Sequence, residues 1–196
     1  KLSERLAENA QQKRELSIRA AELVSEGDVI ALDSGSTANE FIRVLCDKFE
    51  KLTIVTYSRD TFEIASDKSG FSVILTGGNY YAAERSFCGF LAEEFIKRLH
   101  VSKAFIFPSS LSVKYGITID IGEFYNLERG LMSISDRSYA LCDSSKFKNA
   151  SPIRLCEFGE IDAIVTDKQL DEQILKLYRE KGINIIWQIV IATCNS

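Results

Sequence analysis

Residues 32–37 carry the strongest chemical signal in this sequence and read Leu-Asp-Ser-Gly-Ser-Thr. They follow an apolar run and precede a helix-patterned segment, which predicts a turn from a strand into a helix. Gly35 lets a ligand approach the backbone, and hydroxyl donors come from Ser34, Ser36 and Thr37. The first turn of a helix adds unpaired N–H groups and the positive end of its dipole. This combination predicts an anion site, and a phosphate is the natural ligand.

The same turn also has a purely structural interpretation. Thr37 and Glu40 have the spacing of a capping box, in which the hydroxyl accepts from the N–H three residues on and the carboxylate reaches back. Taken alone, these residues support a helix cap as well as they support a ligand site.

Further apolar runs along the chain also end in polar or glycine-containing turns. These turns lie at residues 56–58, 76–79, 108–110 and 143–147. Each of them is ordinary turn chemistry by itself. Ligands of open α/β sheets bind beyond the carboxyl ends of the strands, so the placement of the turns favours one binding edge.

Strand-type and helix-type patterns alternate around these turns. The expected strands are 29–32, 52–56, 71–75, 104–107, 116–121, 139–142, 163–166 and 183–191. The expected helices are 39–49, 59–67, 90–99, 126–136 and 170–181. Such alternation predicts an α/β fold with a mostly parallel sheet flanked by helices.

The chain has 196 residues, which is enough for one substantial core. We expect a single α/β domain over residues 27–196. Residues 1–26 are charged and helix-patterned, and we interpret them as a linker helix followed by the first helix of that domain. Because the sequence starts at Lys1, inside this stretch, we expect a longer protein to precede it.

Composition excludes several classes of function. A formal charge of −4 and a pI near 5.2 argue against a strong nucleic-acid footprint on this chain. Five cysteines without CxxC spacing favour reduced, buried thiols and a cytoplasmic location over a disulfide frame or a zinc site. No apolar segment is long enough to span a bilayer. We therefore expect no metal site, no cofactor and no membrane association.

Six stretches together resemble the C-terminal effector-sensing domain of DeoR-family bacterial transcription regulators. The first is 26–37, where the family has a G-D-x-I-x-L-D-x-G-[ST]-T signature. The others are 52–58, 75–78, Gly89 with 102–105, 143–147 and 161–167. The likeness covers nearly the whole chain. It implies the fold shared by ribose phosphate isomerase, glucosamine phosphate deaminase and coenzyme A transferases.

The resemblance also implies a pocket for a phosphorylated sugar or related metabolite. Its residues would be Asp33, Gly35, Ser36, Thr37, Gly77, Gly78 and Lys146. Thr37 and the backbone near Ser36 would hold the phosphate, and Lys146 would add a point charge. Asp33 would accept hydrogen bonds from sugar hydroxyls. The structural alternatives are a turn or capping role for Asp33 and a solvated side chain for Lys146.

Two stretches depart from the family pattern. The family usually has a small, glycine-containing turn after the fourth strand, whereas this chain has Pro108, which stiffens the backbone. The family commonly carries a Glu and a Lys before a Met of the later helix. Here Arg129 keeps the positive charge, and Glu123 and Glu128 are both candidates for the acid.

The resemblance implies a non-catalytic sensor of a transcription regulator, commonly a repressor. Its effector would shift the spacing of winged helix-turn-helix units that we expect outside this chain, and a homo-oligomer is implied. The enzyme alternative is a sugar-phosphate isomerase, with Asp120 or Glu123 as the proton-moving carboxylate. The single histidine, His100, is interpreted as a helix-capping or packing residue. A third interpretation is an oligomerisation domain with a degenerate pocket.

Overall fold

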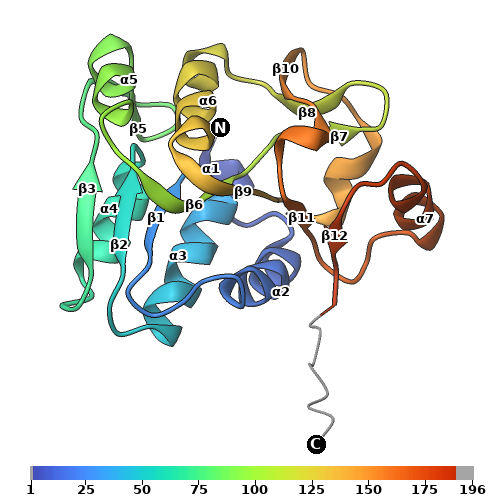
Figure 1. The fold of residues 1–196 in the computed structure, drawn as a ribbon, viewed down its shortest axis with the longest axis horizontal. Coiled ribbons are helices and arrows are strands. Elements are labelled where there is room, and N and C mark those ends of the chain that lie inside the picture. The colour runs from blue at the N-terminus through green and yellow to red at the C-terminus, as the bar shows by residue number, and fades with distance from the viewer. Residues whose placement is uncertain (1, 189–196) are drawn as a thin grey trace, which may run out of the picture.

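The computed structural model describes residues 2–188 and places them around a central parallel sheet (Figure 1). The strand order is β12-β11-β9-β6-β1-β2-β3, and every neighbouring pair is parallel. The strands are β1 (Val29–Leu32), β2 (Thr53–Thr56), β3 (Ser72–Leu75), β6 (Val101–Ile106), β9 (Ser135–Leu141), β11 (Ala163–Val165) and β12 (Ile185–Ile186). The prediction of a mostly parallel sheet is confirmed.

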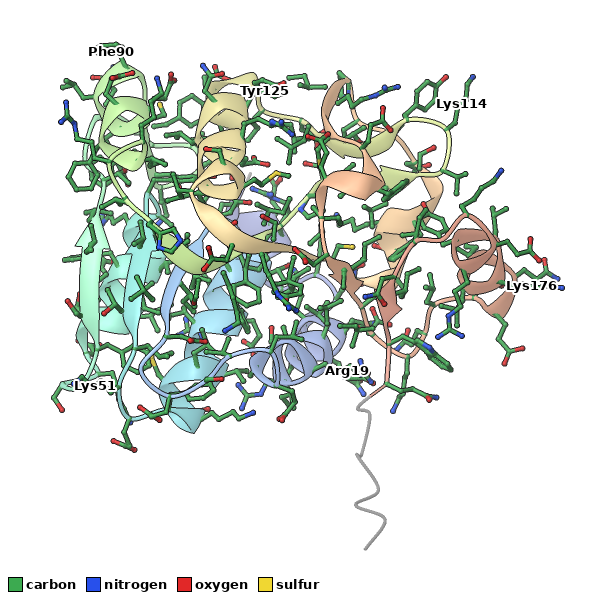
Figure 2. All side chains as sticks on the ribbon, viewed as in Figure 1. Arg19, Lys51, Phe90, Lys114, Tyr125 and Lys176 are labelled. Atoms are coloured by element: carbon green, nitrogen blue, oxygen red, sulfur yellow. The ribbon has the colours of Figure 1, made fainter. Side chains whose placement is uncertain are left out.

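Helices cover both faces of this sheet (Figure 1). One face carries α2 (Ala10–Ala21), α3 (Ser36–Lys48) and α4 (Arg59–Ser66), and the other carries α5 (Phe90–Ile96) and α6 (Tyr125–Ser133). Strand β1 contributes to the apolar core on both faces of the sheet, because Ile30 and Leu32 pack on the first face and Ala31 on the second. Figure 2 shows side chains filling both layers. A strand that is buried on both faces reads as a continuous apolar run, as β1 does.

Two smaller antiparallel units lie beside the main sheet. One has the order β10-β8-β7, formed by β7 (Ser110–Ser112), β8 (Gly116–Ile119) and β10 (Ile153–Cys156). The other pairs β4 (Asn79–Tyr81) with β5 (Ser86–Cys88). We expected β8 as a strand but assigned it to the parallel series, which is wrong. In strands of three or four residues the pattern of apolar and polar residues is too short to indicate which strand each one pairs with, or in which direction.

Some boundaries also differ from the sequence prediction. Within the charged stretch 1–26, where we expected two helices, Asn9 adopts a left-handed conformation (φ 50°) between a short α1 (Leu2–Arg5) and α2. The helix expected over 126–136 ends at Ser133, and β9 follows at once. Of the strand expected over 183–191, the structure forms β12, and residues 189–191 lie outside the described part. The remaining helix is α7 (Glu172–Glu180). Within residues 2–188, no helix is both long and apolar enough to cross a membrane.

Candidate functional site

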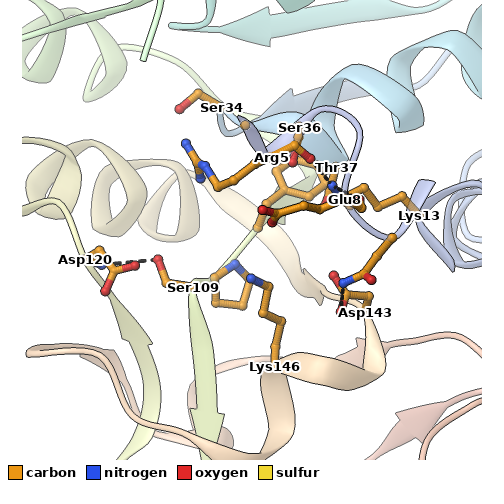
Figure 3. A pocket seen from close by; sticks show the side chains of 14 residues that line it. Arg5, Glu8, Lys13, Ser34, Ser36, Thr37, Ser109, Asp120, Asp143 and Lys146 are labelled. Carbon is orange, nitrogen blue, oxygen red and sulfur yellow. Dashed lines mark hydrogen bonds between the residues drawn. The ribbon is translucent and has the colours of Figure 1, made fainter. Parts of the chain in front are cut away.

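The carboxyl ends of β9, β6 and β1 lie side by side, because these strands are neighbours in the sheet. A pocket opens at this edge, and we call it the main pocket (Figure 3). Its lining residues are Arg5, Glu8, Asn9, Lys13, Ser34, Gly35, Ser36, Thr37, Phe107, Pro108, Ser109, Asp120, Asp143 and Lys146. The edge beyond the strand ends is where sheets of this type bind ligands.

Helix α3 begins at the main pocket without a side-chain cap. Its N-cap is Gly35, whose φ of 131° and ψ of 176° lie in a region that is essentially restricted to glycine. The capping box considered for Thr37 and Glu40 is not formed. The Glu40 carboxylate instead pairs with Arg14 at 3.1 Å. The first turn of α3 therefore directs N–H groups with no side-chain acceptor toward the pocket.

Lys146 reaches the same pocket from the 3-10 helix η2 (Ser144–Lys148). Asp143 caps η2, since its carboxylate accepts the Ser145 N–H at 3.1 Å. Asp167 accepts the Ser144 N–H at 2.7 Å and fixes the start of the same turn. Lys146 is half-buried, and no ion pair among residues 2–188 involves it. Its ammonium group is available to an anion in the pocket.

The N-terminal segment forms a wall of the main pocket that sequence reasoning missed. The Lys13 ammonium is buried and donates to the backbone carbonyl of Glu8 at 2.6 Å and to that of Arg5. Asn9 donates from Nδ2 to the Asp143 carboxylate at 3.2 Å. Burial lowers the pKa of Lys13, and the charge of Asp143 opposes that effect. The charged residues of this segment were the only sequence feature that could have indicated its place at the pocket. They are equally typical of a linker helix.

Asp33 lies beneath this pocket and ties three loops together. Its Oδ2 accepts the Phe107 N–H at 2.9 Å. Its Oδ1 accepts the Ser34 N–H at 2.5 Å and the hydroxyl of Tyr57. Burial raises the pKa of Asp33 to about 6, against the lowering effect of these three hydrogen bonds. The carboxylate thereby fixes the turn that presents Gly35.

A second, smaller pocket adjoins the main pocket, and we call it the acidic recess. Its polar lining residues are Arg5, Asp33, Ser34, Glu84, Ser109, Asp120 and Glu128. Arg5, Ser34, Ser109 and Asp120 line both pockets, so the two pockets are direct neighbours. The guanidinium of Arg5 is paired with the carboxylate of Glu84.

Glu128 is the unsatisfied group of the acidic recess. Its side chain comes from α6 and is 5% exposed, and its Oε2 has no hydrogen-bond partner among the described residues. Burial raises the pKa of Glu128 well above its usual range, and the charge of Asp33 adds to the effect. Both effects favour the neutral form of the Glu128 carboxyl over the carboxylate.

Comparison with known families decides the assignment. The family model of the DeoR C-terminal sensor domain matches residues 8–168. The chain belongs to this family. The resemblance predicted from the six sequence stretches is confirmed, and with it the role of the chain as the effector-binding part of a transcription regulator.

Relatives of this sensor domain are transcription regulators. The chain is 34% identical over 176 residues to the L-fucose operon activator of Haemophilus influenzae, covering 89% of this chain and 70% of that protein. It is 31% identical over 184 residues to the uncharacterized HTH-type transcriptional regulator YulB of Bacillus subtilis, covering 93% and 70%.

A solved enzyme shares the fold of this sensor domain. Ribose 5-phosphate isomerase A from Neisseria gonorrhoeae superposes with a TM-score of 0.51 at 20% sequence identity. The match covers 69% of this chain, and the chain spans about half, 52%, of that enzyme. The expected relation to sugar-phosphate isomerases is confirmed at the level of the fold.

The structure brings together four of the seven predicted site residues in the sensor domain. Gly35, Ser36, Thr37 and Lys146 line the main pocket. Asp33 lies beneath it with its carboxylate engaged by the protein, and its contact with a sugar hydroxyl stays a prediction.

Gly77 and Gly78 follow β3, which is separated from β1 by β2, and they do not line the main pocket. A Cβ at Gly78 would lie 2.7 Å from the Cys88 carbonyl oxygen, so this glycine permits close packing against β5.

The two departures from the family pattern also have definite positions. Pro108 forms part of the wall of the main pocket. Of the two acids considered for the later helix, Glu128 lines the acidic recess, whereas Glu123 lines neither pocket. Arg129 extends away from both pockets and pairs with Glu160 at 2.6 Å. Of the two acids, only Glu128 therefore lies at the candidate site, and its correspondence to the family's glutamate stays a prediction.

Proposed function

We propose that this domain senses a phosphorylated sugar or related metabolite and thereby controls DNA binding by its regulator. The observation that supports this most is the uncapped start of α3 at Gly35, in one pocket with the half-buried Lys146. Open N–H groups, the helix dipole and an ammonium group all favour a phosphate over a neutral ligand. The L-fucose operon activator is named for a sugar operon, and the shared fold of ribose 5-phosphate isomerase supports the same ligand class.

The N-terminal segment, which forms one wall of the main pocket, suggests how ligand binding in that pocket would affect the DNA-binding part. Arg5, Asn9 and Lys13 line the pocket from α1, α2 and the turn between them. An anion at α3 attracts both cations, so it binds more tightly to an arrangement in which they stay close. The effector can shift the equilibrium between two positions of α1 by no more than the difference in its affinity for them.

Calorimetry with hexose 6-phosphates and the matching free sugars tests this proposal. We expect only the phosphorylated ligands to bind. Lys146→Ala should weaken them by roughly 1.5–3 kcal/mol, the range for a hydrogen bond to a charged group. Lys181→Ala, at the exposed end of α7, is the matched control and should leave the affinity unchanged. Equal binding of free and phosphorylated sugars, or equal affinity of both variants, would contradict the proposal.

We also propose that the domain does not catalyse isomerisation. Asp120 lines the main pocket, but Glu123 does not. His100 precedes β6 at the opposite edge of the sheet, where its side chain is exposed and lies 2.8 Å from Asp136. An assay with ribose 5-phosphate checks this proposal: product formation that Asp120→Asn abolishes would show an enzyme.

Finally, we propose a homo-oligomer that uses the exposed face of α5. Phe90 is 71% exposed and Leu91 is 69% exposed, and Phe90 and Tyr125 lie at the same end of the molecule (Figure 2). Exposed apolar clusters commonly mark protein interfaces. Light scattering should show a smaller species for Leu91→Glu but not for Leu177→Glu, which alters an exposed leucine on α7. An unchanged mass for both variants would remove α5 from the interface.

A further inference from the structure

The acidic recess has a surplus of acid that the proposed phosphate site does not use. Four carboxyl groups line it, from Asp33, Glu84, Asp120 and Glu128, and the single guanidinium is that of Arg5. Arg5 is already paired with Glu84. A cation that entered the recess would therefore meet carboxyl oxygens that have no ion-pair partner among the described residues.

Glu128 distinguishes this recess from an ordinary acidic surface cluster. It is almost fully buried, it faces the recess, and its Oε2 lacks a hydrogen-bond partner within residues 2–188. A buried polar oxygen without a partner is costly, so such a group is commonly explained by a ligand or water that satisfies it. Asp33, by contrast, has three protein donors.

The position of the recess relates this acid to the effector. Because Arg5, Ser34, Ser109 and Asp120 line both pockets, a ligand with its phosphate at α3 would extend toward the side of the site where Glu128 lies. A sugar ring bears its substituents at the other end from its phosphate. The group that a sugar phosphate would present to Glu128 is thus a ring substituent, either a hydroxyl or an amine.

We propose that the acidic recess receives an ammonium group, which makes the effector a phosphorylated amino sugar. This inference rests on the proposed function, because the phosphate site orients the ligand. The ammonium donates to Glu128, and the proton of the Glu128 carboxyl leaves to solvent as the ion pair forms. A hydroxyl would leave the same acid protonated, and it would add no positive charge to that of Arg5 beside the four carboxyl groups.

Calorimetry with paired ligands tests the inference. The probes are the 6-phosphates of glucosamine and galactosamine, compared with those of glucose and galactose, at pH 6.5 in two buffers of different ionisation enthalpy. We expect at least one amino sugar to bind ten-fold or more tightly than its hydroxyl counterpart. We also expect it to release about one more proton, a readout that needs no variant. Glu128→Gln should abolish the preference, while Glu123→Gln, on the neighbouring turn, should keep it.

The outcomes separate this inference from the proposed function. Lys146-dependent binding of all four phosphates with equal affinity and proton release would overturn the amino-sugar inference and leave the phosphate sensor intact. A preference that survives Glu128→Gln would overturn it as well. Binding of none of the four, while inorganic phosphate still binds through Lys146, would overturn the inference and exclude hexose 6-phosphates as effectors, and it would leave only the phosphate site itself supported. Absence of any Lys146-dependent binding of phosphate would overturn both.

Discussion

Replacing Glu128 by glutamine should change how the stability of the domain depends on pH. Burial and the charge of Asp33 raise the pKa of Glu128 in the folded protein well above the usual value of 4.5. Between the usual pKa and the raised one, the unfolded chain has largely lost this proton, whereas the folded protein still holds it. Folding therefore takes up one proton, and the free energy of unfolding falls as the pH rises.

The size of this effect follows from proton linkage. One proton of difference changes the free energy of unfolding by about 1.4 kcal/mol for each pH unit. Glutamine has no such proton, and Asp33 titrates in both proteins. The stability of Glu128→Gln minus that of the wild type should therefore increase as the pH rises above 4.5, by at most about 1.4 kcal/mol for each pH unit.

Urea denaturation followed by circular dichroism at constant ionic strength measures this difference. Glu123→Gln removes an exposed glutamate on the adjacent 3-10 helix η1 (Gly122–Phe124) and serves as the control, with a flat difference expected. A flat profile for Glu128→Gln as well would mean that Glu128 is ionised in the folded protein, and the account of the acidic recess would be wrong.

Two further predictions concern the turn at the start of α3. Gly35→Ala should cost about 1–3 kcal/mol of stability, because its backbone conformation is essentially restricted to glycine although no atom would contact the added Cβ. Thermal and urea denaturation measures this loss of stability. Gly159→Ala is the control, because Gly159 also has open space around the added Cβ but has no positive φ. Equal stability of the two variants would refute the prediction. Tyr57→Phe should cost about 1.5–3 kcal/mol at pH 7.5, since it removes a donor to the Asp33 carboxylate, and less at pH 5, where Asp33 with its pKa of about 6 is protonated. Tyr178→Phe is the matched control, because that buried hydroxyl has no partner among the described residues, and a larger loss for Tyr178→Phe would contradict the reasoning.

The parallel sheet was predictable because its strands are buried on both faces. Runs such as Val29–Leu32 are apolar at every position, and helix-patterned segments separate them, so their order along the chain fixes the class of fold. Strand β9 was harder to delimit, since its first residues, Ser135–Arg137, are polar and partly exposed and continue the pattern of α6.

The candidate site was only partly predictable from sequence. The turn at Gly35 and the position of Lys146 follow from local patterns at strand ends. The approach of Arg5 and Lys13 does not, because it depends on the left-handed Asn9 between α1 and α2. Gly78 shows the converse, since a glycine at a strand end serves packing against β5 as readily as ligand binding.

The contacts that hold α1 beside the pocket have a practical consequence for measurements on this domain. Polar contacts join the segment to its surroundings through the Arg5–Glu84 pair, Lys13 and Asn9, although Leu2 is buried. Added salt screens the partly exposed ion pair but leaves the apolar core intact. Rising ionic strength should therefore loosen α1 before it affects the sheet. The affinity for effector measured at several salt concentrations would then depend on two effects at once. One is the docking of α1, and the other is the electrostatic attraction of the site for phosphate.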